Sequence, residues 1–447
     1  MTRYNHSFIL SISFVSALGG YLFGFDFAVI SGALPFLKTT FGLDTYWEGF
    51  ATGSLALGAI LGSVLAGGIS GRYGRRKGLL LAAMLFGVSS LAMALAPTRY
   101  FFIGARFFAG AGVGMASLLS PMYIAEISPA SFRGRMVAIN QLTVVIGILV
   151  TNLINYTLRN TGPDAWRWMF GLGVVPSALF VLGALWLPES PRWLAEAGRT
   201  AEAERLLERI GGKEYAHKTL GGFHRSAAPT DKRSAAQGLH YGALLHRAVF
   251  PSVLVGIGLA VFQQFCGINV VFNYTPAIFA SIGVARDGQL LQTVFIGGVN
   301  LVFTVAAMLL VDKVGRKPLM LAGAVCLSLL YLAVVHLLGT GAAQVSWFLL
   351  ASIGTYALTL APVTWVLIAE VFPGKIRSAA TSLAVLCLWA AYFVLVFTFP
   401  PLFERLGDKT FYLYAGICAL GAVFVALKVK ETKGKTLEEL EDALVIH

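Results

Sequence analysis

The basic stretch GRYGRR at residues 71–76 is repeated as DKVGRK at residues 312–317. Two more charged stretches repeat in the same order. They are AEISP at 125–129 with AEVFP at 369–373, and PES at 188–190 with KET at 430–432. The three offsets are 241, 244 and 242 residues. Charged motifs that recur in order at nearly one offset predict a parallel internal repeat, in which each half of the chain folds alike.

Long apolar segments separate these motifs. The 447 residues are 57% hydrophobic and only 13% charged, and the mean hydropathy is +0.74. Soluble domains carry roughly a quarter charged residues, so the composition predicts an integral membrane protein. Most of the apolar segments have about 20 residues or more, enough to cross about 30 Å of hydrocarbon as a helix. We expect twelve spans, near residues 8–36, 47–70, 78–97, 100–126, 136–158, 167–187, 248–280, 289–311, 318–339, 346–372, 378–400 and 410–428.

The spans and the repeat together predict an all-α integral membrane protein with two six-helix bundles. Residues 1–187 form the first bundle, and residues 248–447 form the second bundle with a cytoplasmic tail. Residues 188–247 interrupt the apolar pattern and form a cytoplasmic linker with short helices. In this linker, Ala201–Ile210 is typical of a surface helix and His217–Gly238 of a loose segment. The linker is either a plain tether or a latch that packs on both bundles.

The basic residues are distributed unevenly along the chain. With the N-terminus in the cytoplasm, the inner loops hold most of the 34 lysines and arginines, and only seven lie in outer loops. This positive-inside bias predicts a multi-pass protein of the cell inner membrane with both termini in the cytoplasm. The bias also explains the net charge of +12 without a nucleic-acid partner.

Two charged residues lie at depth in the apolar segments, Asp26 in the first span and Arg106 in the fourth. Asp26 is about 12 Å and Arg106 about 10 Å from the same end of the bundle, so the two can pair. Such charges are expensive in hydrocarbon and usually functional. Pairing favours the charged form of Asp26, whereas burial disfavours it. A movement that separates the pair would thus link protonation to shape. The alternative is a static salt bridge between the two helices.

Amide side chains also lie within the spans. An amide donates and accepts without a net charge, as sugar hydroxyls require. Gln264 and Asn269 are about 140° apart on a regular helix, so they share a face only if the helix breaks, which Gly267 permits. A single amide serves helix packing as readily as ligand binding, but several together predict a polar ligand site. The five amides are Gln141, Gln263, Gln264, Asn269 and Asn300.

Further motifs carry a family resemblance across essentially the whole chain. Beside the two basic stretches they are RGR at 133–135, PESPRWL at 188–194, QQ at 263–264 with GIN at 267–269, and ETKG at 431–434. The chain resembles the sugar porter branch of the major facilitator superfamily, for which PESPRWL together with QQ-x-x-GIN is specific. The resemblance implies monosaccharide substrates and alternating access to one central site between the bundles.

The resemblance also implies a lining for that site. Aromatic rings match the apolar C–H faces of a sugar, and by resemblance Phe23, Trp365 and Trp389 join the five amides. Asn273 is included with them, although a tyrosine is common at its position. Proton-coupled sugar porters resemble this chain at Asp26, whereas passive animal glucose facilitators commonly carry asparagine there. We therefore expect monosaccharide:proton symport coupled by Asp26 and Arg106.

Charged residues also gather at the inner helix ends. Glu126 and Glu370 are each followed by proline at +3 and arginine at +7. Ion pairs between the halves would hold the outward-open state and break on inward opening. Positive-inside topology alone explains the bases but not these glutamates. The predicted cytoplasmic gate consists of Arg75, Arg76, Glu126, Arg133, Glu189, Arg192, Asp312, Arg316, Glu370 and Arg377.

Other patterns exclude further functions. The sequence has no paired catalytic carboxylates, metal-ligand cluster or nucleophile triad, so we expect no enzyme, cofactor or metal. Gly110, Gly112 and Gly114 predict close packing of the fourth span. The expected partners of a monomeric protein are a monosaccharide, a proton and the lipid bilayer. Two alternatives remain, a passive uniporter in which Asp26–Arg106 is only structural and, more remotely, a sugar sensor that moves no solute.

Overall fold

The computed structural model describes residues 4–129, 132–226, 249–340, 344–372 and 376–433, together with Leu244 and His246. The secondary structure of these residues is helical, without strands. Eleven segments are long and apolar enough to cross a membrane, and the last of them, Ala379–Lys428, contains two helices joined by a 3-10 turn at Gly407–Lys409. The described residues thus confirm the all-α fold with twelve spans.

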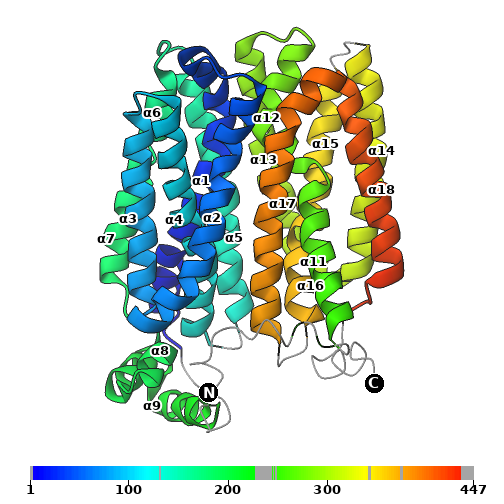
Figure 1. Cartoon of the computed structure of the whole chain (residues 1–447). Coiled ribbons are helices and arrows are strands. Elements are labelled where there is room, and N and C mark those ends of the chain that lie inside the picture. The colour runs from blue at the N-terminus through cyan, green and yellow to red at the C-terminus, as the bar shows by residue number, and fades with distance from the viewer. Residues whose placement is uncertain are drawn as a thin grey trace.

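The first bundle forms six of the spans (Figure 1). Side chains of Asn5, Asp44 and Thr98 accept hydrogen bonds at the N-termini of the first, second and fourth helices, as N-caps do. A Cβ atom at Gly110 would lie 2.1 Å from the Leu55 carbonyl oxygen, which confirms the close packing of the fourth span. The helices are α1 (His6–Phe41), α2 (Thr45–Tyr73), α3 (Arg75–Ala94), α4 (Arg99–Ile127), α5 (Arg133–Leu158), and α6 (Ala165–Gly171) with α7 (Val174–Trp186) as the sixth span.

The second bundle contains two interrupted spans. The seventh breaks at Gly267, whose φ of 85° is left-handed and suits glycine, so the predicted break is confirmed. The tenth breaks at Thr359, with φ −121° and ψ −81°, which the sequence did not indicate. The helices are α11 (Phe250–Phe265), α12 (Ile268–Ser281), α13 (Arg286–Val314), α14 (Arg316–Gly339), α15 (Val345–Leu358), α16 (Leu360–Val371), α17 (Arg377–Leu406) and α18 (Thr410–Lys428).

The linker begins with α8 (Pro191–Glu196) and α9 (Thr200–Ser226), which turns at Gly212. The expectation of a loose segment from His217 is therefore wrong as far as Ser226, and residues 227–243 lie outside the described residues. Contacts tie the linker to the first bundle. The Trp193 indole donates to the Gly71 carbonyl at 2.8 Å, and the Ile210 carbonyl accepts from the Asn5 amide at 2.9 Å. These contacts hold the described helices of the linker against the first bundle.

Figure 1 shows the two bundles side by side, with the start of α1, the end of α18 and the linker helices α8 and α9 at one end. We call this end, which carries residues 71–76 and 312–317, the basic end, and the other the opposite end.

Candidate functional site

The charged pair lies between α1 and α4. Asp26 and Arg106 are both fully buried, and one contact of 3.4 Å joins Nη1 of Arg106 to Oδ1 of Asp26. Among the described residues, Oδ2 of Asp26 and Nε and Nη2 of Arg106 have no hydrogen-bond partner. A buried polar atom without a partner costs roughly 1–3 kcal/mol. The pair is therefore poorly satisfied, and proton or water binding at Asp26 would relieve part of that cost.

Amides gather at the break of the seventh span. Nδ2 of Asn269 donates to Oε1 of Gln264 at 2.5 Å, across Gly267. Nε2 of Gln264 contacts Oε1 of Gln263 at 3.3 Å, and Nε2 of Gln263 donates to the Ala361 carbonyl at 3.4 Å. All three amides are buried. The left-handed Gly267 thus lets α11 and α12 place their amides on one face, which a straight helix would not allow.

The amide chain extends to a tyrosine. Nδ2 of Asn273 donates to the Asn269 carbonyl at 2.7 Å and to the Tyr392 hydroxyl at 3.1 Å. Asn273 and Tyr392 are buried, and Tyr392 comes from α17. Sequence analysis did not single out Tyr392. The signal that would have found it is a hydroxyl three residues after Trp389, on the same helix face.

Aromatic rings join the two bundles beside this chain of amides. The ring of Phe23 meets the buried Trp389 edge to face, with centroids 5.8 Å apart. Phe27 contacts Phe272 in the same way at 5.5 Å. Such pairs are worth about 0.5–1.5 kcal/mol beyond their buried area. They close the space between α1 and the second bundle on one side of the amides.

Three predicted site residues make no hydrogen bond or ring contact with this cluster among the described residues. Gln141 on α5 is exposed, and its side chain makes no hydrogen bond within the described residues. Asn300 on α13 is buried without a side-chain hydrogen bond to any of them. Trp365 on α16 has 46% of its surface exposed. Hydrogen bonds and ring contacts thus link Gln263, Gln264, Asn269, Asn273, Tyr392, Trp389 and Phe23, whereas Gln141, Asn300 and Trp365 make no such contact with them among the described residues.

At the opposite end the two bundles touch through polar groups that sequence analysis did not single out. Nε of Arg159 pairs with Oδ1 of Asp287 at 2.7 Å. Nδ2 of Asn152 donates to the Thr293 carbonyl at 2.7 Å. The Thr45 hydroxyl donates to Glu404 at 3.0 Å. Each contact joins a helix or loop of one bundle to the other, so the opposite end is closed.

At the basic end the ion pairs stay within one bundle. Arg75 binds Glu126 through Nε at 3.1 Å and Nη2 at 3.0 Å. Nη2 of Arg316 lies 3.6 Å from Glu370. Across the described ranges these ion pairs at the basic end stay within one bundle, and the pairs between the halves stay a prediction. Arg133 is exposed, and the side chains of Asp312 and Arg377 lie outside the description.

The chain matches the family described as "Sugar (and other) transporter" over residues 12–444. The chain belongs to this sugar transporter family. It is 37% identical to the D-xylose-proton symporter of Escherichia coli, covering 98% of this chain and 96% of that one. It is 38% identical to the glucose transport protein of a Synechocystis strain, with coverage of 98% and 97%.

Solved structures agree with the assignment of this chain to the sugar transporter family. The inward open conformation of the Escherichia coli xylose transporter matches with a TM-score of 0.86 and 35% identity, covering 98% of this chain and all of that one. The same transporter with 6-bromo-6-deoxy-D-glucose bound matches with a TM-score of 0.82 and 36% identity, covering 99% and 100%. These relatives are transporters of the major facilitator superfamily and not enzymes.

Two glutamates of the sugar transporter occupy equivalent places at the basic end. Oε1 of Glu189 accepts from the backbone amides of Arg75 at 2.8 Å and Arg76 at 3.1 Å, in the first turn of α3. Glu431 accepts from the amides of Arg316 and Lys317 at 3.1 Å, in the first turn of α14. A carboxylate stabilises a helix N-terminus through its unpaired amides and the helix dipole.

The charge state of Glu431 follows from these donors. Partial burial raises the pKa of Glu431, but backbone amides of Lys433, Arg316, Lys317 and Thr432 outweigh it and hold the pKa below its usual range. Glu431 was not among the predicted gate residues, although the KET stretch that contains it was one of the repeated motifs.

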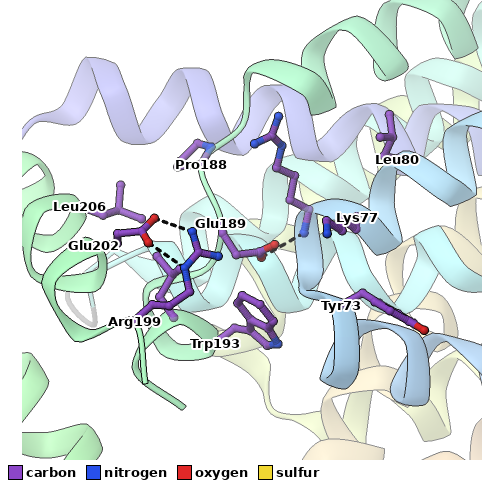
Figure 2. Close-up of a pocket in the computed structure, with 11 residues that line it drawn as sticks. Tyr73, Lys77, Leu80, Pro188, Glu189, Trp193, Arg199, Glu202 and Leu206 are labelled. Atoms are coloured by element: carbon purple, nitrogen blue, oxygen red, sulfur yellow. Dashed lines mark hydrogen bonds and ion pairs between the residues drawn. The ribbon is translucent and has the colours of Figure 1, made fainter. Parts of the chain in front are cut away.

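A cavity of about 560 Å³ lies between α3 and the linker helices. Figure 2 shows Glu189 and Trp193 in its wall and Arg199 paired with Glu202 at its rim. Arg76 also lines it and is held by the Ala184 carbonyl at 3.1 Å. Arg192 lies outside this lining and pairs with Glu196 at 3.0 Å. The cavity belongs to the basic end and does not reach the amide cluster.

Proposed function

We propose that this sugar transporter carries a monosaccharide together with a proton. The observation that carries the proposal is the buried Asp26–Arg106 pair, which is joined by one contact of 3.4 Å and leaves three polar atoms unpartnered. A permanent structural salt bridge gains most when its geometry satisfies every lone pair and proton. This pair does not reach that geometry, so a small movement of α4 against α1 is enough to separate it.

The proton step follows from the surroundings of Asp26. While Arg106 is in contact, the guanidinium stabilises the carboxylate. Once Arg106 moves away, a carboxylate in a dry site lacks a counter-charge and takes up a proton. Protonation and conformation are then linked, so that a proton gradient biases the alternation of the two bundles.

The amide cluster suits a monosaccharide. Gln263, Gln264 and Asn269 present donors and acceptors without net charge, and Phe23 and Trp389 lie beside them to meet C–H faces. Gln141, Asn300 and Trp365 come from α5, α13 and α16 and complete the proposed lining. The D-xylose-proton symporter and the glucose transport protein among the relatives support a pentose or a hexose as substrate.

The proposed orientation puts the basic end in the cytoplasm. Positive-inside topology then gives cytoplasmic termini in a cell inner membrane. Bacterial relatives support this location. In this orientation the opposite end, where the bundles contact each other, faces outward, which supports an inward-facing conformation. Because the site lies between two bundles of one chain, a monomer suffices.

Reconstituted liposomes test the proton coupling. Adding a transported sugar outside should acidify the lumen, and Asp26→Asn should lose uphill accumulation while still exchanging sugar. Sugar flux in the wild type without proton flux would leave a passive uniporter. Full accumulation by Asp26→Asn would remove the role of Asp26.

Binding measurements test the amide cluster. Gln264→Ala or Asn269→Ala should weaken sugar binding by about 1–3 kcal/mol each, because a sugar hydroxyl loses its partner. Gln289→Ala is the matched control, since this amide donates to the Val284 carbonyl near the opposite end. A panel of radiolabelled monosaccharides competing for uptake identifies the sugar. Unchanged affinity in both cluster variants would rule out the proposed site.

A further inference from the structure

Tyr392 lies where the two parts of the proposed mechanism meet. Its hydroxyl forms the end of the amide chain, through Asn273 Nδ2 at 3.1 Å and Asn273 Oδ1 at 3.4 Å. Its ring packs against Phe27, the neighbour of Asp26 in α1, with centroids 6.0 Å apart. Only 2% of its surface is exposed. One buried phenol therefore contacts both the amide chain of the second bundle and the helix that carries Asp26.

The hydroxyl is also within electrostatic range of both charged groups, Arg106 and Asp26. These two side chains leave an acceptor oxygen and two N–H groups unpartnered among the described residues. A phenol hydroxyl donates to a carboxylate and accepts from a guanidinium, so it can bind either the unpartnered Asp26 oxygen or an unpartnered Arg106 N–H group. Its present partner, Asn273, competes for the same hydroxyl.

A continuous series of hydrogen bonds thus runs from the sugar amides to Tyr392, whose ring packs on Phe27 beside Asp26 in α1. Gln264 accepts from Asn269 at 2.5 Å, and the Asn269 carbonyl accepts from Asn273 at 2.7 Å. Asn273 in turn holds Tyr392. A ligand that draws Asn269 or Asn273 into its own hydrogen bonds loosens the hold on the Tyr392 hydroxyl. Freed from Asn273, the hydroxyl turns toward the charged pair.

We propose that Tyr392 is a positioning residue that transmits occupancy of the amide cluster to the Asp26–Arg106 pair. The proposal rests on the proposed symport. It assigns the connection between the bundles to a side chain of α17 that approaches α1, so sugar binding in the second bundle alters proton binding in the first. Because linkage is reciprocal, the proton state of Asp26 alters sugar affinity by the same factor.

The surroundings of Asp26 leave few other routes for this effect. Arg106 of α4 is the charged group that contacts Asp26, and Tyr392 of α17 is a titratable group within electrostatic range of it. From α5, Asn155 donates to the Ala28 carbonyl at 3.2 Å, and Phe170 of α6 lies below the Arg106 guanidinium at 5.8 Å. From α12, Phe272 packs on Phe27. None of these neighbouring groups titrates.

The test compares Tyr392→Phe with the wild type in liposomes and in a binding assay over pH. Typical coupling between two sites changes affinity by about 5- to 150-fold. We expect Tyr392→Phe to reduce the change of sugar affinity with pH at least about five-fold and to lose uphill accumulation, with a smaller loss of sugar counterflow. Asn273→Ala should flatten the pH profile in the same way, and the double variant should add little to either.

Tyr331→Phe is the matched control. Tyr331 of α14 is fully buried, and within the described residues its hydroxyl has no hydrogen-bond partner, so its loss should leave the pH profile and accumulation at the wild-type level. Thermal melting of both variants tests whether they fold. If Tyr392→Phe does not fold, the pH dependence of sugar affinity in Asn273→Ala tests the proposal instead.

Each outcome decides between the proposals. Wild-type accumulation and pH profile in Tyr392→Phe overturn the role of Tyr392 and leave symport intact. An equal loss of affinity at every pH also overturns it, because Tyr392 then serves only as a sugar contact. A wild type that moves sugar without protons overturns the symport on which this inference rests.

Discussion

The two ends of the molecule hold their helices together in different ways. At the opposite end, Arg159, Asn152 and Thr45 of the first bundle bind groups of the second. At the basic end, Arg75 and Arg316 bind glutamates of their own bundles. Contacts between bundles must break when the transporter changes conformation, whereas contacts within a bundle persist. Under the proposed alternating access, the opposite end is therefore a gate in its closed state, and the described ion pairs of the basic end stabilise each half separately.

The largest effect is expected at the closed gate. A Cβ atom at Gly49 would lie 2.3 Å from the Phe397 carbonyl oxygen of the other bundle, so Gly49→Trp should prevent closure of the opposite end and abolish transport. Overpacking costs about 1–3 kcal/mol, which shifts the conformational balance by about 5- to 150-fold.

Gly67→Trp on the same helix is the control for this change. A Cβ atom there has no neighbour within 4 Å, so transport should persist. Cysteine labelling from each side of the membrane reports the balance. Normal transport by Gly49→Trp would show that the opposite end need not close as described.

The next effect concerns the stability of the basic end. The side chains of Arg75 and Glu126 are 11% and 10% exposed, so Arg75→Ala leaves the Glu126 carboxylate largely buried without its partner. We expect a loss of about 3 kcal/mol in the free energy of unfolding. Arg316→Ala should cost about 1 kcal/mol, because its contact of 3.6 Å is longer and more exposed.

Thermal melting in detergent measures both losses, and accessibility labelling measures the conformational balance. If each pair acts within one bundle, its loss should lower the free energy of unfolding without favouring either open state. If Glu126→Gln instead favours the inward-open state, Glu126 also pairs between the halves in another conformation, as the sequence predicted.

A smaller effect follows from the protonation of Glu431. Its pKa is lowered in the folded protein, so its contribution to stability is present above the unfolded pKa, near 4.5, and is lost as pH falls through the lower folded value. Glu431→Gln should remove about 0.3–1 kcal/mol at neutral pH. Melting curves from neutral to acid pH check this. A variant that retains the acid-dependent loss of the wild type would assign that loss to other carboxylates.

The smallest effect is expected at the exposed ion pair of the closed gate. Arg159 and Asp287 are 19% and 62% exposed, so Arg159→Ala should favour opening of that end by only about 0.2–1 kcal/mol, and less in high salt. Arg167→Ala is the control, since Arg167 pairs with Asp164 three residues away in the same bundle. Equal shifts in both variants would show that Arg159 does not hold the bundles together.

The twelve spans, the repeat and the charged pair were predictable because each depends on local sequence or on depth in the membrane. Asp26 and Arg106 were conspicuous in apolar spans, and counting residues put them at one depth. The break at Gly267 was predictable because two amides five residues apart need it to share a face. No residue pattern around Thr359 predicts the break of the tenth span there, which only the tertiary structure shows.

Other features could not be read from spacing. Tyr392 is one of 15 tyrosines, and its place three residues after Trp389 indicates only a helix face, whereas its contact with Phe27 depends on the approach of α17 to α1. The glutamates of the predicted gate have the expected charge, but their partners depend on which conformation the bundles adopt. Arg159 and Asp287 are ordinary loop-end charges until the two bundles meet.

The sequence by itself determined a membrane-embedded pair of homologous bundles, because hydrocarbon demands long apolar helices and tolerates few charges. The tertiary structure decided at which end the bundles contact each other, which glutamate each arginine binds, and that a phenol bonded to Asn273 packs on Phe27 next to Asp26. Those features depend on distances between residues more than a hundred positions apart, and the packing of the two bundles sets these distances.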